Sequence, residues 1–274
     1  MQIYVFQGLD ADLPVLTEWG YIPAKNLTPE VHPITLSDSN ELCLATIFEV
    51  IGPREYRGFN ELRISGSTLP VCLPSYLFIY SKIRDQFAYY PIPFVRRDDL
   101  VHIVRRVPHS LFTIQAFDDL ADFWLRIVNT RKFSPKVLGI AMYALYEKQV
   151  KGCEIGSRIP KGILSCDPEA RQKIFDVVKD QISSKFTAFG KHYSFVNYKI
   201  PADAYNLMEF LSPLHYATSI KKNKGYWTVF YVPDVQINDT ASIKGNVSST
   251  EAYQGVDVIT NGKNLICARM LIGT

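Results

Sequence analysis

The sequence predicts an α+β fold: a mixed or antiparallel sheet built from N- and C-terminal strands, with a central block of three helices. Apolar runs of strand length occur before residue 110 and again after residue 190, and amphipathic helical patterns fill the segment between them. The composition, 47% apolar and 21% charged over 274 residues, is that of a globular chain rather than a disordered one. Strands, then helices, then strands again favour α+β over an alternating α/β order.

The chain is predicted to form a single domain over residues 1–274. Its length suits one large domain or two modest ones. Residues 110–117 are the one candidate for a division between domains, and they lack the composition of a flexible linker.

The N-terminal elements are predicted as a strand, a short helix and a β-rich region. Residues 3–6 are an apolar run typical of a buried strand. Asp12 is expected to cap a short helix that has Pro14 in its first turn and stops at Gly20. Residues 60–107 are expected to form several short strands, because prolines interrupt them repeatedly.

The central block is predicted from three helical patterns. The first covers residues 118–129, where apolar side chains recur at spacings of three and four. The second covers residues 134–152 and the third residues 167–182. Ser134 and Asp167 are each followed by a proline, and an N-cap residue before a proline is a common helix start.

The C-terminal third is expected to return to strands, at residues 192–199, 225–232 and 264–272, with a short helix at 202–211. Residues 233–261 are rich in Asn, Ser, Thr and Gly, and they are expected to be loop with one weak strand. A strand that ends the chain can lie at a sheet edge and pair with a second copy. A homo-oligomer is therefore one expected form of the protein.

The sequence predicts a cytoplasmic protein with reduced cysteines, no cofactor and no metal site. The five cysteines are odd in number and widely spaced, and no C-x-x-C pair occurs. No two histidines have the spacing of a helical metal site. We see no signal peptide and no apolar stretch near the ~20 residues that span a membrane, so no membrane partner is expected.

Two groups of basic residues are the candidate binding surface. One group flanks a predicted strand at residues 98–104, and the other lies at a turn directly before two aromatic residues. Lysine and arginine neutralise phosphates, and aromatic rings stack on unpaired bases. Neighbouring residues of a strand point to opposite faces, so at most one of each arginine pair can join a single patch. The predicted contact residues are Arg96, Arg97, Arg105, Arg106, Lys221, Lys222, Lys224, Tyr226 and Trp227. The alternative is a solvated face whose charges pair with nearby acids.

An enzyme with a dispersed, phosphodiesterase-like site is an alternative function. His192 and Ser194 have the H-x-S form of two-histidine phosphoesterases, but at the second copy, His215, Ala217 replaces the hydroxyl residue. No nucleophile elbow, P-loop or dinucleotide-binding glycine motif occurs. No catalytic residue is assigned.

The N-terminal segment resembles the start of ADP-ribosyltransferase domains. The resemblance rests on Ile3-Tyr-Val-Phe-Gln-Gly8, Leu13-Pro-Val-Leu16 and Gly20-Tyr-Ile-Pro23. It implies a strand, a short helix and a glycine turn beside an NAD site, with Tyr4, Arg57 and Glu251 as further candidates. Val5 stands at the position of the family's NAD-contacting residue and cannot donate a hydrogen bond.

The predicted function is binding or assembly without catalysis. Residues 1–50 contain seven acids and one lysine, a local charge of −6, although the whole chain carries +3. This asymmetry predicts that one part of the surface attracts anions. The expected partner is RNA or single-stranded nucleic acid, an acidic protein or a second copy, as for many viral and phage accessory or structural proteins. A self-assembling structural subunit is the remaining alternative.

Overall fold

The computed structural model describes residues 2–65, 67–72, 76–112, 164–165, 167–169, 171–172, 175–176, 179, 183–188, 191–223, 225–233 and 239–274. The chain divides into two compact units. Unit 1 contains Met1–Val107 and Asn238–Thr274, and unit 2 contains Pro108–Ile237. Unit 2 is therefore inserted between the two segments of unit 1. The single domain stays a prediction.

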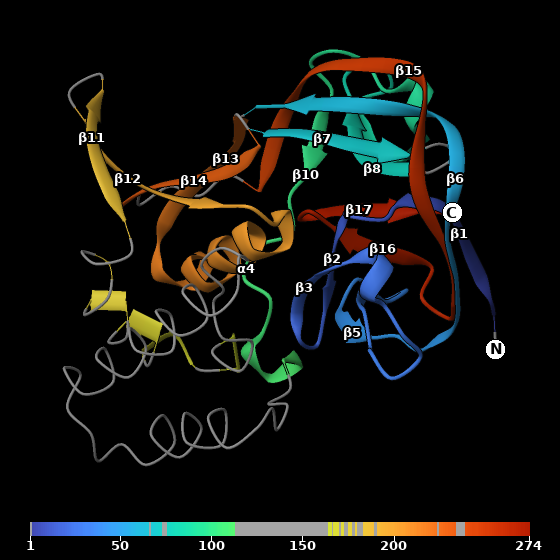
Figure 1. Cartoon of the computed structure of the whole chain (residues 1–274), viewed down its shortest axis with the longest axis horizontal. Helices are drawn as coiled ribbons and strands as arrows, with labels where there is room; N and C mark the ends of the chain where they lie inside the picture. Colours follow the sequence, from blue (N-terminus) through green and yellow to red (C-terminus); the bar gives the residue numbers. More distant parts are fainter. Residues whose placement is uncertain are drawn as a thin grey trace. The chain divides into compact units, whose positions relative to one another are not determined.

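Unit 1 is built on an antiparallel sheet whose strands come from both ends of the chain (Figure 1). The described strands follow the order β3-β2-β16-β17-β8-β10-β15-β6-β7, with β1 paired to β15 and β9 paired to β8. A separate two-stranded sheet joins β4 and β5. The bounds are β1 (Tyr4–Asp10), β2 (Pro14–Thr17), β3 (Gly20–Pro23), β4 (Ile34–Leu36), β5 (Leu42–Leu44), β6 (Ile47–Ile64), β7 (Ser67–Cys72), β8 (Tyr76–Ser81), β9 (Gln86–Pro91), β10 (Leu100–His102), β15 (Thr240–Thr260), β16 (Asn264–Cys267) and β17 (Met270–Gly273).

Strands β6 and β15 form a long ribbon, which Figure 1 shows in blue-cyan and orange-red. The middle of the ribbon is largely exposed, and its buried residues lie mainly at residues 60–64 of β6 and 255–260 of β15. Gly52 and Gly58, with φ of +118° and +80°, and several register shifts let the ribbon bend. The predicted loop at residues 233–261 is thus mostly strand. Pairing with β6 stabilises a sequence whose own strand propensity is weak.

A tight hairpin replaces the helix predicted from Asp12 to Gly20. Strand β2 pairs with β3, and the Thr17 hydroxyl donates a hydrogen bond of 2.8 Å to the Gly20 carbonyl at the turn. All four residues of β2 are buried, so the segment has no polar face on which a surface helix would depend. The short helix implied by the ADP-ribosyltransferase resemblance is likewise replaced by a strand.

A second tight hairpin divides the strand predicted at residues 264–272. Ala268 and Arg269 have φ of +50° and +71°, and they form the two-residue loop between β16 and β17. Arg269 is only 2% exposed, and its Nε donates to the Val104 carbonyl at 3.3 Å. Strand β17 pairs with β16 and with β8. The terminal strand is therefore interior, and the expectation that it forms a sheet edge is wrong.

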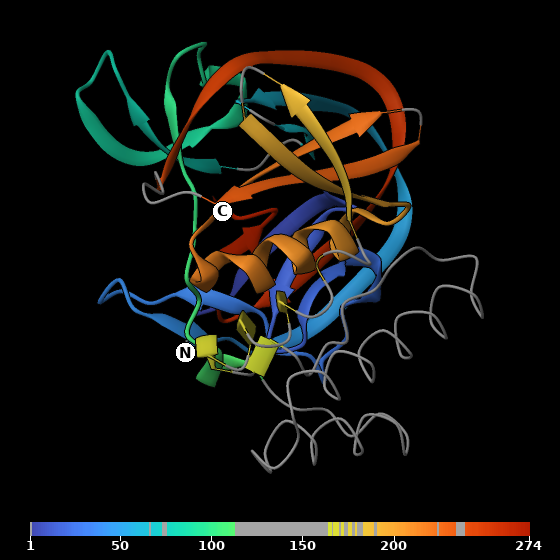
Figure 2. The ribbon, with the colours of Figure 1, turned by 90° about the vertical axis from the view of Figure 1, so that its left-hand side faces the viewer.

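Unit 2 contains an antiparallel sheet in the order β11-β12-β14-β13. Helix α4, the orange helix of Figure 2, lies along one face of this sheet and contacts β12, β13 and β14. The predictions of a helix at 202–211 and of strands at 192–199 and 225–232 are confirmed. The bounds are β11 (Ser184–Ala188), β12 (Lys191–Tyr198), α4 (Pro201–Leu211), the 3-10 turn η5 (Ser212–Leu214), β13 (Tyr216–Asn223) and β14 (Tyr226–Pro233).

The described residues form a mostly-β protein with large antiparallel sheets, so the prediction of an α+β fold organised around three central helices is wrong. The helices predicted at 118–129 and 134–152 lie outside the described residues. In the third predicted segment, the described positions 168–169, 171–172, 175–176 and 179 are helical. The high strand content comes from pairing between strands far apart in the sequence, above all β1, β6 and β15. Local sequence patterns do not reveal such pairing.

Within the described ranges, no helix combines the length and the apolar character needed to cross a membrane.

Candidate nucleic-acid interface

Helix α4 and Phe175 cover one face of the unit 2 sheet, which we call the inner face. Ile220, Val229 and Tyr231 on this face are 2%, 0% and 4% exposed. The ring of Phe175 lies 5.5 Å from that of Tyr231 and 6.1 Å from that of Phe210 in α4, measured between centroids. Alternate residues of the same strands point to the opposite, outer face.

The outer face presents aromatic rings beside a cation. Phe195 of β12 pairs with Phe230 of β14, and their ring centroids are 6.0 Å apart. Both side chains are half-buried, and Tyr226 at the start of β14 is 45% exposed. Lys221 of β13 is exposed, and its Nζ lies 5.9 Å from the centre of the Phe230 ring. Partly exposed rings next to a cation are groups on which unpaired bases stack.

A hydrogen-bonded pair lies on this face between the Phe195–Phe230 pair and Tyr226. The Thr228 hydroxyl donates to the Asn197 side-chain oxygen at 2.7 Å. Thr228 is 9% exposed, whereas Asn197 is exposed and brings an amide to the surface. The face therefore offers polar groups as well as rings to a ligand.

The sheet of unit 2 carries positive charge without any acid. Residues 184–199 and 215–233 contain no Asp or Glu. The acids of α4, Asp203 and Glu209, are buried, at 7% and 0% exposure. An acid-free basic sheet attracts polyanions. Its six lysines are Lys185, Lys191, Lys199, Lys221, Lys222 and Lys224.

The structure distributes the predicted contact residues of this unit between the two faces. Lys221 and Tyr226 lie on the outer face. Lys222 and Trp227 pair on the inner side, with the lysine Nζ 5.5 Å from the indole centre. Lys222 is exposed, but Trp227 is only 7% exposed. Lys224 lies outside the described residues.

The predicted arginines belong to unit 1. Arg96 and Arg97 are exposed in the loop between the 3-10 turn η2 (Ile92–Phe94) and β10. The Arg96 backbone N–H donates to the Asp99 carboxylate at 2.9 Å. Arg105 is half-buried, and Arg106 is exposed with a φ of +56°. The arginines and the lysines thus form two local groups, one in each unit.

The sequence reading missed Phe195, Asn197, Thr228 and Phe230. Two signals for them are present: alternation along β12 and β14, and the absence of acids from both segments. In β14 the alternation is hard to recognise from the sequence, because most residues of the run at 225–232 are apolar or aromatic on both faces.

A polar cluster in unit 1 joins β1, β6 and β15. Asp257 is 4% exposed, and one of its oxygens accepts hydrogen bonds from the Gly8 N–H at 2.7 Å and the Tyr56 hydroxyl at 2.5 Å. Its other oxygen pairs with Arg54. The Tyr253 hydroxyl donates to the Gly8 carbonyl at 2.8 Å. Burial, and then the bond to Asp257, raise the pKa of Tyr56. These groups bond to one another across three strands, which is the arrangement of a structural brace.

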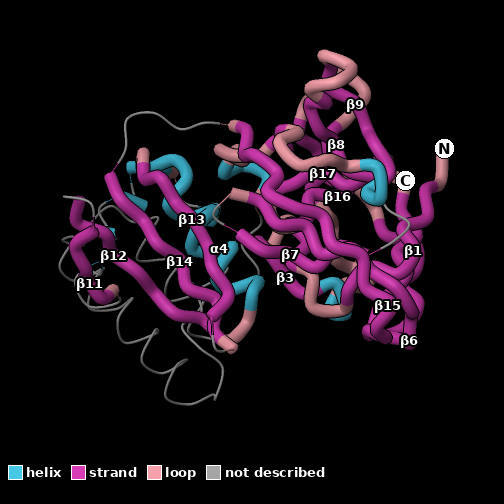
Figure 3. The backbone as a smooth tube through the Cα atoms, turned by 90° about the horizontal axis from the view of Figure 1, so that it is seen from above, coloured by secondary structure: helices cyan, strands magenta, loops and turns pink. Residues whose placement is uncertain are grey.

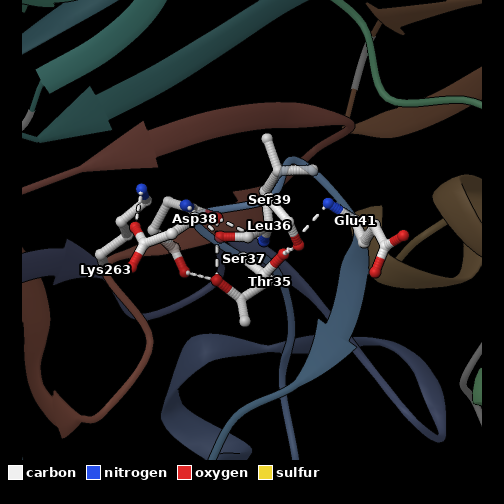
Figure 4. Close-up of polar contacts among 8 residues, drawn as sticks. Thr35, Leu36, Ser37, Asp38, Ser39, Glu41 and Lys263 are labelled. Atoms are coloured by element: carbon white, nitrogen blue, oxygen red, sulfur yellow. Dashed lines mark hydrogen bonds and ion pairs between the residues drawn. The ribbon is translucent and has the colours of Figure 1, made fainter.

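A second brace secures the β4–β5 hairpin (Figure 4). The Thr35 hydroxyl donates to both the backbone and the side-chain oxygen of Asn264, at 2.8 Å each. The Leu36 N–H donates to the same side-chain oxygen at 2.8 Å, and Lys263 pairs with Asp38. These bonds attach the hairpin to β16.

The residues named for the ADP-ribosyltransferase resemblance do not converge. Tyr4 pairs with Thr260, but Arg57 pairs with Ala252, eight residues back along β15. That separation corresponds to roughly 26 Å of strand. The Arg57 side chain is 84% exposed, and Glu251 is exposed as well. In the part of the chain that the structure describes, no group of three or more His, Cys, Asp or Glu residues is placed to hold a metal ion.

The described residues define a predominantly antiparallel β protein. No protein-family model matches the chain, and no curated protein matches its sequence. Among solved structures, a bacterial intein-like domain from Clostridium thermocellum is 15% identical with a TM-score of 0.31, over 36% of this chain and 67% of that chain. The AceL NrdHF class 3 split intein, a splice-inactive variant, is 10% identical with a TM-score of 0.32, over 38% and 67%. The transcription factor IIB Mja mini-intein is 10% identical with a TM-score of 0.25, over 39% and 75%. Similarity this distant defines neither a family nor an activity for the chain.

Proposed function

We propose that the outer face of β12, β13 and β14 binds single-stranded nucleic acid. The observation that carries the proposal is a face on which half-buried Phe195 and Phe230 and exposed Tyr226 lie beside Lys221, on strands without acids. The rings provide stacking surface and the lysines provide charge, and single strands need both from a protein.

The aromatic rings favour a single strand over a duplex. In a duplex, neighbouring base pairs already cover the faces of each base, so an open sheet offers the rings no base to stack on. Helix α4 packs on the inner face of the sheet, so it is not placed to enter a major groove from the outer face. A strand laid across β14 would place bases on the rings and its phosphates near the lysines of β13, which is the edge strand.

The proposal is tested by reversing the charge of the three neighbouring lysines. The variant Lys221→Glu/Lys222→Glu/Lys224→Glu and the unaltered protein are titrated with fluorescent oligouridine at several salt concentrations. We expect at least ~10-fold weaker binding and a smaller salt slope, since each phosphate contact that is lost removes roughly 0.7 from that slope.

Lys244→Glu provides the matched control, because Lys244 is an exposed lysine of unit 1. It is expected to bind as the unaltered protein does. An unaltered salt slope in the triple variant, or a failure of the unaltered protein to bind at low salt, would overturn the proposal.

A further inference from the structure

Strand β9 is an exposed sheet edge in unit 1. Within the described residues, it pairs with β8 alone, and Figure 3 shows it on the outer side of that strand. The hairpin and the turn that follows it carry Tyr76, Ile83, Phe87 and Phe94, which are 38%, 67%, 47% and 72% exposed. An edge strand bordered by exposed apolar side chains is a template for pairing with another strand.

The other long edges of the described sheets carry features that prevent such pairing. Pro70 in β7 has no backbone N–H to donate, Lys221 and Lys222 place charge on β13, and a register shift near Gly8 makes β1 irregular. The interior of strand β9 has no proline, no charged residue and no register shift. Residues 86–95 contain no charged side chain, and the first proline of this run, Pro91, ends the strand.

One face of the hairpin is an aromatic ladder. Phe78 of β8 faces Tyr89 of β9, with centroids 5.1 Å apart, and Tyr80 faces Phe87 at 5.2 Å. His102 of β10 adds an edge contact to Phe78 at 6.1 Å. Aromatic pairs across antiparallel strands stabilise the pairing.

We propose that β9 pairs antiparallel with β9 of a second copy, about a two-fold axis at Ala88. In that register Phe87 of each copy faces Tyr89 of the other, which repeats the Tyr80–Phe87 and Phe78–Tyr89 pairs already present across β8 and β9. Ala88 faces its own counterpart, so a small side chain lies where the two strands approach on the axis. No like charges meet, because residues 86–95 are uncharged. A two-fold contact of this kind is closed and gives a dimer.

Sedimentation of the full chain over a range of concentrations tests the pairing. We expect a concentration-dependent dimer that Phe87→Lys weakens at least ~10-fold, because the substitution charges the edge. Ile3→Lys, which charges an exposed apolar residue outside the hairpin, is the control and should dimerise normally. A monomer at the highest soluble concentration, or a dimer that Phe87→Lys leaves intact, would overturn the proposal.

A cysteine placed on the axis tests the register by a separate measurement. Oxidised Ala88→Cys should yield a peptide pair joined through residue 88 of both copies, since opposed Cβ atoms in antiparallel strands lie ~5 Å apart. Gln86→Cys faces Tyr90 of the other copy in this register, so it should give no symmetric cross-link. Equal cross-linking of the two variants, or none at residue 88, would contradict the register even if Phe87→Lys fails to fold.

Discussion

Asp257 joins three strands through a single carboxylate. It accepts hydrogen bonds from Gly8 and Tyr56 and pairs with Arg54, although these partners are up to 249 residues away in the sequence. The Gly8 position leaves no room for a side chain: it has a φ of +61°, and an added Cβ would lie 2.8 Å from the Tyr253 hydroxyl. The hydrogen bonds and ion pair of this brace therefore require a glycine at position 8 as well as the side chains of Arg54, Tyr56 and Asp257.

Replacing Asp257 with asparagine should destabilise unit 1. The amide keeps one acceptor but turns an N–H₂ group toward donors, so a buried donor is left without its acceptor and Arg54 loses its counter-charge. We expect a loss of about 3 kcal/mol in the free energy of unfolding, measured by denaturant titration. Glu55→Gln, which removes an exposed carboxylate 3.8 Å from Arg57, should change the stability by less than about 1 kcal/mol. Equal effects of the two substitutions would show that the brace is not structural.

At the residue scale, the sequence could predict which segments carry charged and aromatic side chains, but not which residues contact one another in the fold. Lys221 and Tyr226 were identifiable because a lysine-rich turn precedes an aromatic pair. The role of Asp257 could not be identified from the sequence, because it depends on contacts with Gly8 and Arg54. No local sequence pattern indicates that these residues lie side by side.

At the scale of elements, strand β14 carries large apolar side chains on both of its faces. Its inner residues Val229 and Tyr231 pack in the core, and its outer residue Phe230 pairs with Phe195 at the surface. Both faces are apolar, so the sequence pattern reads as a fully buried strand. The proposed stacking of bases rests on this surface ring.

Substituting Phe230 separates stacking from charge. Phe230→Leu keeps an apolar side chain on the strand but removes the ring, and stacking is worth ~1–3 kcal/mol per base. We expect oligouridine affinity to fall roughly 10-fold with an unchanged salt slope, in contrast to the lysine variants. Phe94→Leu, at an exposed phenylalanine of unit 1, serves as the control. The stacking role fails if both variants bind equally well.

The elements that could be predicted have strong local signals. Helix α4 starts with Pro201 at its first turn, and β12 and β14 are rich in aromatic and β-branched residues. Strand β15 was read as loop because its Asn, Ser, Thr and Gly residues are typical of turns, whereas pairing with β6 determines its structure. The β2–β3 and β16–β17 hairpins were missed because their turns lack the usual Asn-Gly signal.

At the scale of the whole molecule, the chain separates its charges between two units. The acidic N-terminal fifty residues belong to unit 1, and the acid-free strands belong to unit 2. The local charge is −6 in the former, and the latter carry six lysines without acids, so the proposed site for a polyanion lies in unit 2. The long-range pairing of β1 and β6 with β15 joins the two sequence segments of unit 1, a topology that sequence periodicity does not reveal.

Ultraviolet cross-linking of the full chain to oligouridine, followed by peptide mapping, tests the central claim most directly. The adducts should fall on the peptides that contain Phe195, Tyr226 and Phe230, because bases stacked on these rings are in contact with them. Adducts confined to the aromatic ladder of β8 and β9, or no adduct at a concentration that saturates binding, would show that the outer sheet face of unit 2 is not where a single strand binds.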